Sequence, residues 1–228
     1  MITSTARLLM LLVSGVLLTA CVTSSTSIFN TQVSEEQALQ DYLQLSMGYL
    51  EQGELDSAKR HLNNAMEIEP NSSEVHAVWG LVYSRQGDTE LADESFRRAI
   101  RLNGRNSQAR NNYAAFLFAN GRYQDAYDQL ENVVTDVNYR SRPQAFENLG
   151  LAAVRLNRSE DAENAFNRAL QLNANQLRSS LELANINLGK EDIQQARAYY
   201  NNFTSLAQRF NLGHSARSLL IGARLEKA

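Results

Sequence analysis

A pattern that repeats every 34 residues constrains this chain more than any other feature of its sequence. Gly53 and Gly87 are one repeat apart, and so are Ala58 and Ala92. The same spacing joins Tyr49 to Tyr83, Leu62 to Phe96, Ala65 to Ala99 and Ile68 to Leu102. Further copies contain, in turn, Leu117, Gly121, Ala126, Leu130 and Val133, then Leu149, Gly150, Val154, Asn157, Ala162, Phe166, Ala169 and Leu172, then Leu183, Ala184, Ala196, Tyr200 and Phe203. Such a period indicates stacked units that bury their apolar faces against one another.

Glycine and proline positions predict two helices in each copy. Gly53 and Gly87 stand where a first helix ends in the left-handed conformation, and Asn157, the next best residue for that conformation, replaces glycine in the fourth copy. Pro70 stops the second helix of the first copy. The chain has only two prolines and 11 glycines in 228 residues, so long helices are permitted and a turn-rich sandwich of strands is disfavoured.

The order of apolar and small residues in each copy resembles the tetratricopeptide repeat. The resemblance implies an all-α, right-handed superhelix of about eleven helices, in which Ala and Gly let paired helices approach closely. The expected repeat domain is 35–228, with repeats at 39–72, 73–106, 107–142, 143–176 and 177–210 and a terminal helix at 214–227 that caps the stack.

The first 20 residues have the composition of an export signal. Arg7 is their one charged residue, and the apolar stretch from Leu8 to Leu18 is shorter than the about 20 residues that span a bilayer. The segment Leu18-Thr19-Ala20-Cys21 resembles the bacterial lipobox, whose cysteine receives a diacylglycerol and becomes the new N-terminus. Cys21 is also the only cysteine of the chain. The alternatives are an ordinary signal peptide with an incidental cysteine, or a reduced cysteine in a buried cytosolic helix.

The lipobox implies a mature, lipid-anchored protein of residues 21–228, attached through acylated Cys21. Two or three acyl chains anchor a protein stably, whereas one binds only marginally. Val22 in place of an acidic residue resembles an outer-membrane address, so the predicted location is the periplasmic face of the outer membrane. Residues 21–34 are Ser/Thr-rich and lack a helical period, which is typical of a flexible tether.

Composition excludes several classes of function. The 22 Lys and Arg residues are balanced by 25 Asp and Glu, and they form no basic stripe, so nucleic acid is not an expected partner. One cysteine cannot form an internal disulfide. The three histidines, His61, His76 and His214, do not have the spacing of metal ligands. Glycine-rich phosphate loops and nucleophile elbows are absent from the sequence. We therefore expect a protein that is not an enzyme, with no catalytic residue, metal, cofactor or small-molecule substrate.

The function class that remains is the binding of another protein through the first helix of each repeat. In tetratricopeptide repeats, a few positions of this helix line a groove. These positions hold Leu43, Met47, Leu50 and Glu51, then Ala77, Leu81, Ser84 and Arg85, then Asn111, Ala115, Phe118 and Ala119, then Glu147, Leu151 and Arg155, then Arg178, Leu181, Asn185 and Leu188. We predict that this groove, without a Lys and Arg cluster, holds an amphipathic helix, an extended segment or the tether rather than an acidic tail. The patch of Leu43, Met47 and Leu50 is the leading candidate site.

Several segments of the chain together resemble one particular family. Residues 111–117 with Gly121-Arg122-Tyr123, then Tyr139, Arg142 and 146–151, and finally 216–220 with Gly222, Arg224 and Leu225, resemble type IV pilus biogenesis lipoproteins of the PilF/PilW family. The resemblance implies a pilotin, an outer-membrane lipoprotein that binds the secretin subunits of the type IV pilus and supports their assembly into a ring. Other members continue beyond the equivalent of Leu225 to complete a sixth helix pair.

Two other hypotheses remain open. One is a repeat lipoprotein of the same build that serves another envelope assembly machine. The other is a periplasmic enzyme whose site is assembled from scattered polar residues of the groove. Converging carboxylates or histidines in a pocket would support the second hypothesis.

Overall fold

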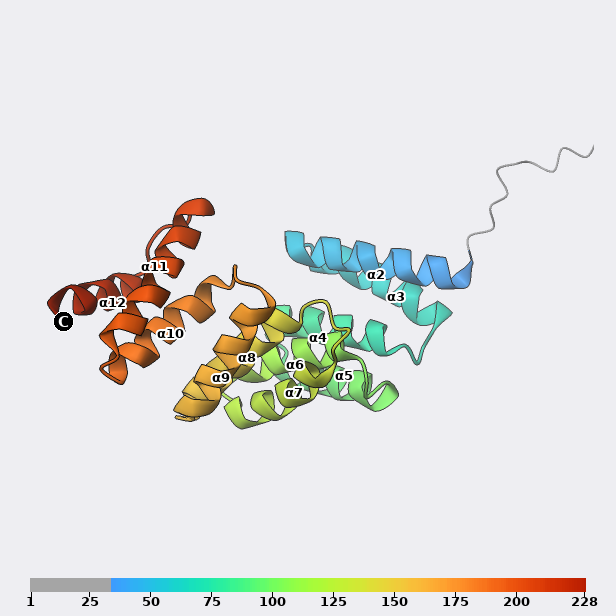
Figure 1. Ribbon diagram of the computed structural model, residues 1–228. Coiled ribbons are helices and arrows are strands. Elements are labelled where there is room, and N and C mark those ends of the chain that lie inside the picture. The colour runs from blue at the N-terminus through green and yellow to red at the C-terminus, as the bar shows by residue number, and fades with distance from the viewer. Residues whose placement is uncertain (1–33) are drawn as a thin grey trace, which may run out of the picture. The chain divides into compact units, whose positions relative to one another are not determined.

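The computed structural model describes residues 34–228, and these form an all-α chain of eleven helices without a strand (Figure 1). The helices are α2 (Glu35–Gln52), α3 (Leu55–Ile68), α4 (Ser73–Gln86), α5 (Thr89–Leu102), α6 (Ser107–Ala119), α7 (Tyr123–Thr135), α8 (Arg142–Arg155), α9 (Ser159–Leu172), α10 (Leu177–Gly189), α11 (Ile193–Arg209) and α12 (Ala216–Lys227). The predicted fold class and helix number are confirmed. The export signal, Cys21 and residues 22–33 of the tether lie outside the described residues.

The chain divides into two compact units, 1–37 and 38–228. Of the first unit, the structure describes only the residues at the start of α2, where the backbone N–H of Gln37 donates to Ser34 Oγ at 3.1 Å. This bond caps the helix. The second unit holds the rest of α2 and all the other helices. Between residues 34 and 228, none of the helices combines the length and the apolar character that crossing a bilayer requires.

The ends of the first helices follow the predicted pattern. Gly53, Gly87 and Gly121 have φ angles of 80°, 82° and 76°, and Asn157 takes their place with a φ of 58°. This left-handed residue ends the first helix and turns the chain into the second. In the fifth copy the left-handed residue is Glu191, with a φ of 63°. Nothing in the residue type of Glu191 indicates this conformation, so only the repeat register identifies it.

Small residues let the two helices of a repeat approach each other. An ideal Cβ added to Gly80 would lie 2.8 Å from ring carbons of Phe96, and one added to Gly150 would lie 2.6 Å from Phe166 Cε1. Both rings are fully buried. The first copy has Ser46 at the corresponding position, and its hydroxyl donates to the Tyr42 and Ala58 carbonyls at 2.7 and 3.2 Å. A buried polar side chain is therefore accommodated because its hydrogen bonds are made.

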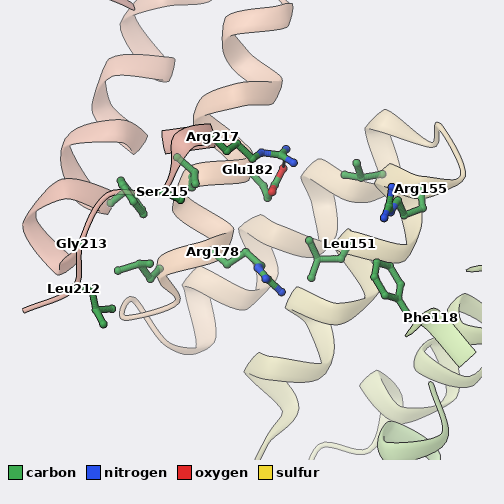
Figure 2. Close-up of a pocket in the computed structure, with 13 residues that line it drawn as sticks. Phe118, Leu151, Arg155, Arg178, Glu182, Leu212, Gly213, Ser215 and Arg217 are labelled. Carbon is green, nitrogen blue, oxygen red and sulfur yellow. Dashed lines mark hydrogen bonds and ion pairs between the residues drawn. The ribbon is translucent and has the colours of Figure 1, made fainter. Parts of the chain in front are cut away.

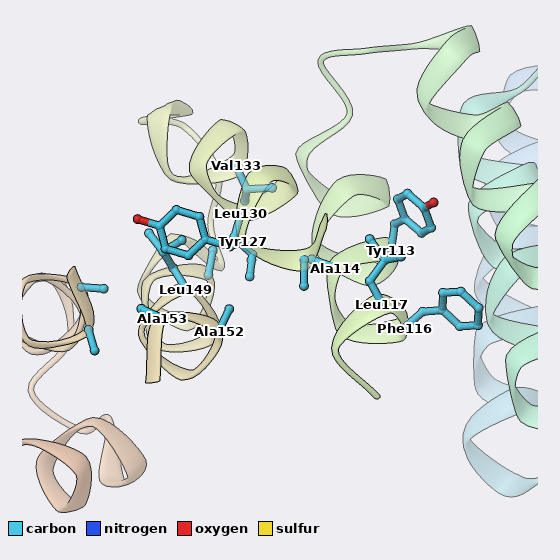
Figure 3. Close-up of a cluster of buried hydrophobic side chains, with 14 of the residues drawn as sticks. Tyr113, Ala114, Phe116, Leu117, Tyr127, Leu130, Val133, Leu149, Ala152 and Ala153 are labelled. Atoms are coloured by element: carbon cyan, nitrogen blue, oxygen red, sulfur yellow. The ribbon is translucent and has the colours of Figure 1, made fainter. Parts of the chain in front are cut away.

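The apolar core runs along the stack in three main clusters. The middle one joins α5 to α10, and Figure 3 shows Tyr113, Leu117, Leu130 and Ala153 among its members. A second cluster joins α2, α3 and α4, and a third joins α10, α11 and α12. Each helix pair packs against the next, as in α5 with α6, α7 with α8 and α9 with α10. A stack of this kind positions side chains from several first helices along one surface.

Candidate partner-binding groove

The first-copy patch that the sequence predicts is not an open surface. Leu43 and Leu50 are 7% and 4% exposed and belong to the core cluster that also contains Leu62 and Val75. Met47 is half-buried and packs against the same cluster. The prediction of a patch available to a partner is wrong for Leu43 and Leu50, because these side chains fill the space between α2 and its neighbours.

Four further predicted groove residues are buried: Ala77, Glu147, Leu181 and Leu188. Ala77 packs with Ala99 and Ala109 in a small cluster of its own. Glu147 accepts hydrogen bonds from the backbone N–H and the hydroxyl of Ser179, at 3.0 and 2.9 Å, and from Gln144 at 3.1 Å. Glu147 therefore links α8 to the first turn of α10, where the helix dipole favours a carboxylate. Its predicted place on a partner-facing surface is wrong.

The other predicted residues divide into those that line the groove described next and those that do not. Leu81, Asn111 and Asn185 are half-buried, and Glu51, Ser84, Arg85, Ala115 and Ala119 are exposed. None of these eight lines the groove. The predicted residues that do line it are Phe118, Leu151, Arg155, Arg178 and Leu181.

This groove lies among α6, α8, α10, α11 and the α11–α12 connection, and it has a volume of about 610 Å³ (Figure 2). Seven of its 13 lining residues are apolar: Phe118, Leu151, Val154, Leu177, Leu181, Phe203 and Leu212. The remaining residues include three arginines, Arg155, Arg178 and Arg217, and one carboxylate, Glu182. We call this surface the α8–α10 groove.

Glu182 and Arg217 form an ion pair at one edge of the α8–α10 groove, and Figure 2 shows their side chains pointing toward each other. The Glu182 side chain is 6% exposed and that of Arg217 is 53% exposed. Burial raises the pKa of Glu182, and nearby Glu147 raises it further, while Arg217 and Arg178 act in the opposite direction. The pair joins α10 to the start of α12, so the terminal helix forms one wall of the groove.

Arg155 is held at another edge by aromatic rings. Its Cζ lies 5.8 Å from the centroid of Phe118 and 5.1 Å from that of Tyr123. A guanidinium stacked on a ring keeps its N–H edge free for a carboxylate. Arg178 is exposed, and among residues 34–228 no hydrogen bond or ion pair of its side chain is found. Its charge acts on Glu182.

Sequence reasoning missed eight of the 13 lining residues, among them Leu212, Ser215 and Arg217, and it did not recognise that the predicted Arg155 and Arg178 make the groove basic. The prediction was a groove without an arginine cluster, whereas three arginines line it. The repeat period contained a usable signal. Leu212 and Ser215 follow the predicted groove residues Arg178 and Leu181 by 34 residues, so continuing the frame for one more copy finds them. Among residues 34–228, no group of His, Cys, Asp and Glu could hold a metal ion.

Comparisons with known proteins agree with the repeat. The tetratricopeptide-repeat family model matches residues 78–144 and 147–205. The chain is 37% identical over 223 residues to the type IV pilus assembly protein PilF of Pseudomonas aeruginosa. The aligned residues cover 97% of this chain and 86% of PilF. A solved structure of P. aeruginosa PilF matches with a TM-score of 0.80 at 37% identity, over 85% of each chain.

The crystal structure of PilW, a widely conserved type IV pilus biogenesis factor, matches with a TM-score of 0.71 over 84% of this chain and 86% of PilW. At 22% identity, PilW shows a common fold. Identity to PilF extends over nearly the whole chain, and the helix pairs carry the same repeat. The chain therefore belongs to the tetratricopeptide-repeat family of type IV pilus biogenesis proteins that includes PilF.

Proposed function

We propose that this protein is an outer-membrane lipoprotein that binds secretin subunits of the type IV pilus and promotes their localisation and assembly into multimers. The observation that carries the proposal is the 37% identity to the pilus assembly protein PilF across 97% of the chain. The repeat fold supports a binding role, because stacked helix pairs present long surfaces to other proteins. The lipobox-like segment ending at Cys21 supports the anchored location.

The physical basis of this function is tethering. Acyl chains on Cys21 hold the repeats at the inner leaflet of the outer membrane. A secretin segment bound by the repeats is then kept at a high effective concentration beside other bound subunits. Assembly is accelerated because association between subunits no longer depends on diffusion through the periplasm. No bond is made or broken by the repeat protein itself.

Deletion of the gene tests the proposal. The mutant strain is expected to lose heat-resistant secretin multimers from its outer membrane and to lose surface pili, while secretin monomers remain detectable. Wild-type multimers in the deletion strain would refute the secretin role. A strain carrying Cys21→Ser tests the anchor separately, since the altered protein is expected to leave the membrane fraction with its fold intact.

A further inference from the structure

We propose that the α8–α10 groove binds a segment of the secretin that combines large apolar side chains with carboxylates. This inference rests on the proposed function for the identity of the partner. The chemistry of the segment, by contrast, follows from the groove alone.

The floor of the groove requires apolar contact. The apolar lining consists of Leu151 and Val154 of α8, Leu177 and Leu181 of α10, and Phe118, Phe203 and Leu212. Figure 2 shows Phe118 and Leu212 on opposite sides of the groove. Leu212 is 52% exposed, so it offers apolar surface that the fold itself leaves in water. Covering such surface is the main source of favourable free energy in peptide binding.

The charges at the groove's edges select the polar part of the ligand. Glu182 forms its ion pair with Arg217, while Arg178 acts on Glu182 only from a longer distance. Arg155 and Arg178 therefore form no ion pair among the described residues. Both charges border apolar surface, where a carboxylate gains more from a guanidinium than it does in bulk water. The whole chain has a net charge of -3, so the positive charge at the groove does not reflect an overall positive charge of the protein.

The chain's own tether does not match these charges. Residues 22–34 contain Ile28 and Phe29 but no Asp or Glu. A tether bound in the groove would therefore leave Arg155 and Arg178 unpaired. A fatty acid has one carboxylate and an alkyl chain, but the groove is open to solvent and its two unpaired arginines lie on different helices. A segment with apolar and acidic side chains along its length satisfies both arginines at once.

An array of overlapping 12-residue peptides, covering the mature secretin of the same strain, tests the proposal with the full-length protein purified in detergent. Each peptide is present as encoded and with Asp and Glu replaced by Asn and Gln. Bound peptides are expected to contain apolar and acidic residues, and their neutral versions are expected to bind at least about tenfold more weakly. Equal binding of the two versions would overturn the proposal.

Variants of the protein locate the binding surface. Arg155→Glu with Arg178→Glu is expected to weaken binding of the acidic peptides at least about tenfold, and Leu212→Ser is expected to weaken it without a change of charge. Arg60→Glu with Arg168→Glu is the matched control, because these arginines are exposed and lie outside the groove. Loss of binding in the control as well, or in neither double variant, would contradict the assignment.

Competition separates the alternative occupants. Neither the peptide of residues 22–34 nor laurate is expected to displace a bound secretin peptide. Displacement by either would contradict the proposal and would indicate that the displacing molecule is the occupant of the groove. Absence of any bound peptide overturns the groove proposal, while loss of multimers on gene deletion would still support the secretin function. Acidic peptides that bind the groove, in a protein whose deletion leaves multimers intact, would contradict only the function.

Discussion

At the scale of single residues, the closeness of paired helices depends on positions where no side chain fits. Gly150 faces the ring of Phe166, and Gly80 faces the ring of Phe96. Neither ring can move aside without disturbing its neighbours, because both are fully buried. These glycines are therefore required by packing and not by backbone conformation.

Gly150→Ala is expected to destabilise the protein by about 1–3 kcal/mol, because the new methyl group would lie within 2.8 Å of three ring carbons of Phe166. Gly48→Ala is the matched control. Nothing lies within 4 Å of a Cβ at Gly48, inside α2, so the higher helix propensity of Ala should stabilise the protein by up to about 1 kcal/mol. Urea unfolding measures both, and a Gly150→Ala midpoint at or above that of the wild type would contradict the packing account.

The buried carboxyl group of Glu182 predicts how the free energy of unfolding depends on pH. Burial raises the pKa of Glu182. Between the usual Glu pKa and this raised value, the folded state binds more protons than the unfolded state, so the free energy of unfolding falls as pH rises. Glu182→Gln removes this contribution. The free energy of unfolding of the wild type minus that of Glu182→Gln should therefore decrease as the pH rises above the usual Glu pKa of about 4.3. A difference that increases with pH would show that the ion pair with Arg217 outweighs burial.

At the scale of elements, α12 packs as the first helix of a further copy of the repeat. Ser218 lies 34 residues after Ala184 and is fully buried. Gly222 faces Tyr200 of α11, whose hydroxyl donates to the Ser218 carbonyl at 3.1 Å. Ile221 and Leu225 of α12 belong to the third core cluster, and the capping of the stack by this helix stays a prediction. Leu219 and Leu220 lie on the exposed side of α12.

Gly222→Ala is expected to loosen α12, because the new Cβ would lie 2.4 Å from Tyr200 Oη and would break the bond to Ser218. The expected cost is about 1 kcal/mol, confined to the end of the chain. Hydrogen exchange should become faster by about fivefold in 216–227 and stay unchanged in α6–α9. Gly213→Ala, where nothing lies within 4 Å, is the control. Equal hydrogen-exchange rates of α12 in the Gly222→Ala and Gly213→Ala variants would contradict the predicted contact between the new Cβ and Tyr200.

The sequence predicted the elements better than the site because the two depend on different information. The period and residues such as Gly87 and Asn157 determine where helices begin and end, and these signals are local. The exposure of a side chain, by contrast, depends on residues that are distant in the sequence. Leu43 and Leu181 occupy equivalent positions of their repeats and both are buried, yet only Leu181 borders a groove, because the α11–α12 connection forms a wall beside it. Arg217 reaches that groove from another copy, which single-repeat patterns do not reveal.

At the scale of the whole molecule, the repeat scaffold carries a groove with apolar and basic character. The proposed function adds a lipid anchor at Cys21 to this scaffold. The groove uses side chains from three repeats and the terminal helix. Its integrity therefore depends on the packing of α8, α10 and α12 together. A change that displaces the terminal helix should weaken partner binding even when every arginine is retained.

The most direct test measures the fraction of secretin in heat-resistant multimers after the deletion strain receives different versions of the gene at equal protein levels. The wild type and Arg60→Glu with Arg168→Glu should restore the multimers. Arg155→Glu with Arg178→Glu should restore less than about a tenth of the wild-type amount, since a carboxylate would meet like charges in the groove. Full restoration by this last variant would contradict the account.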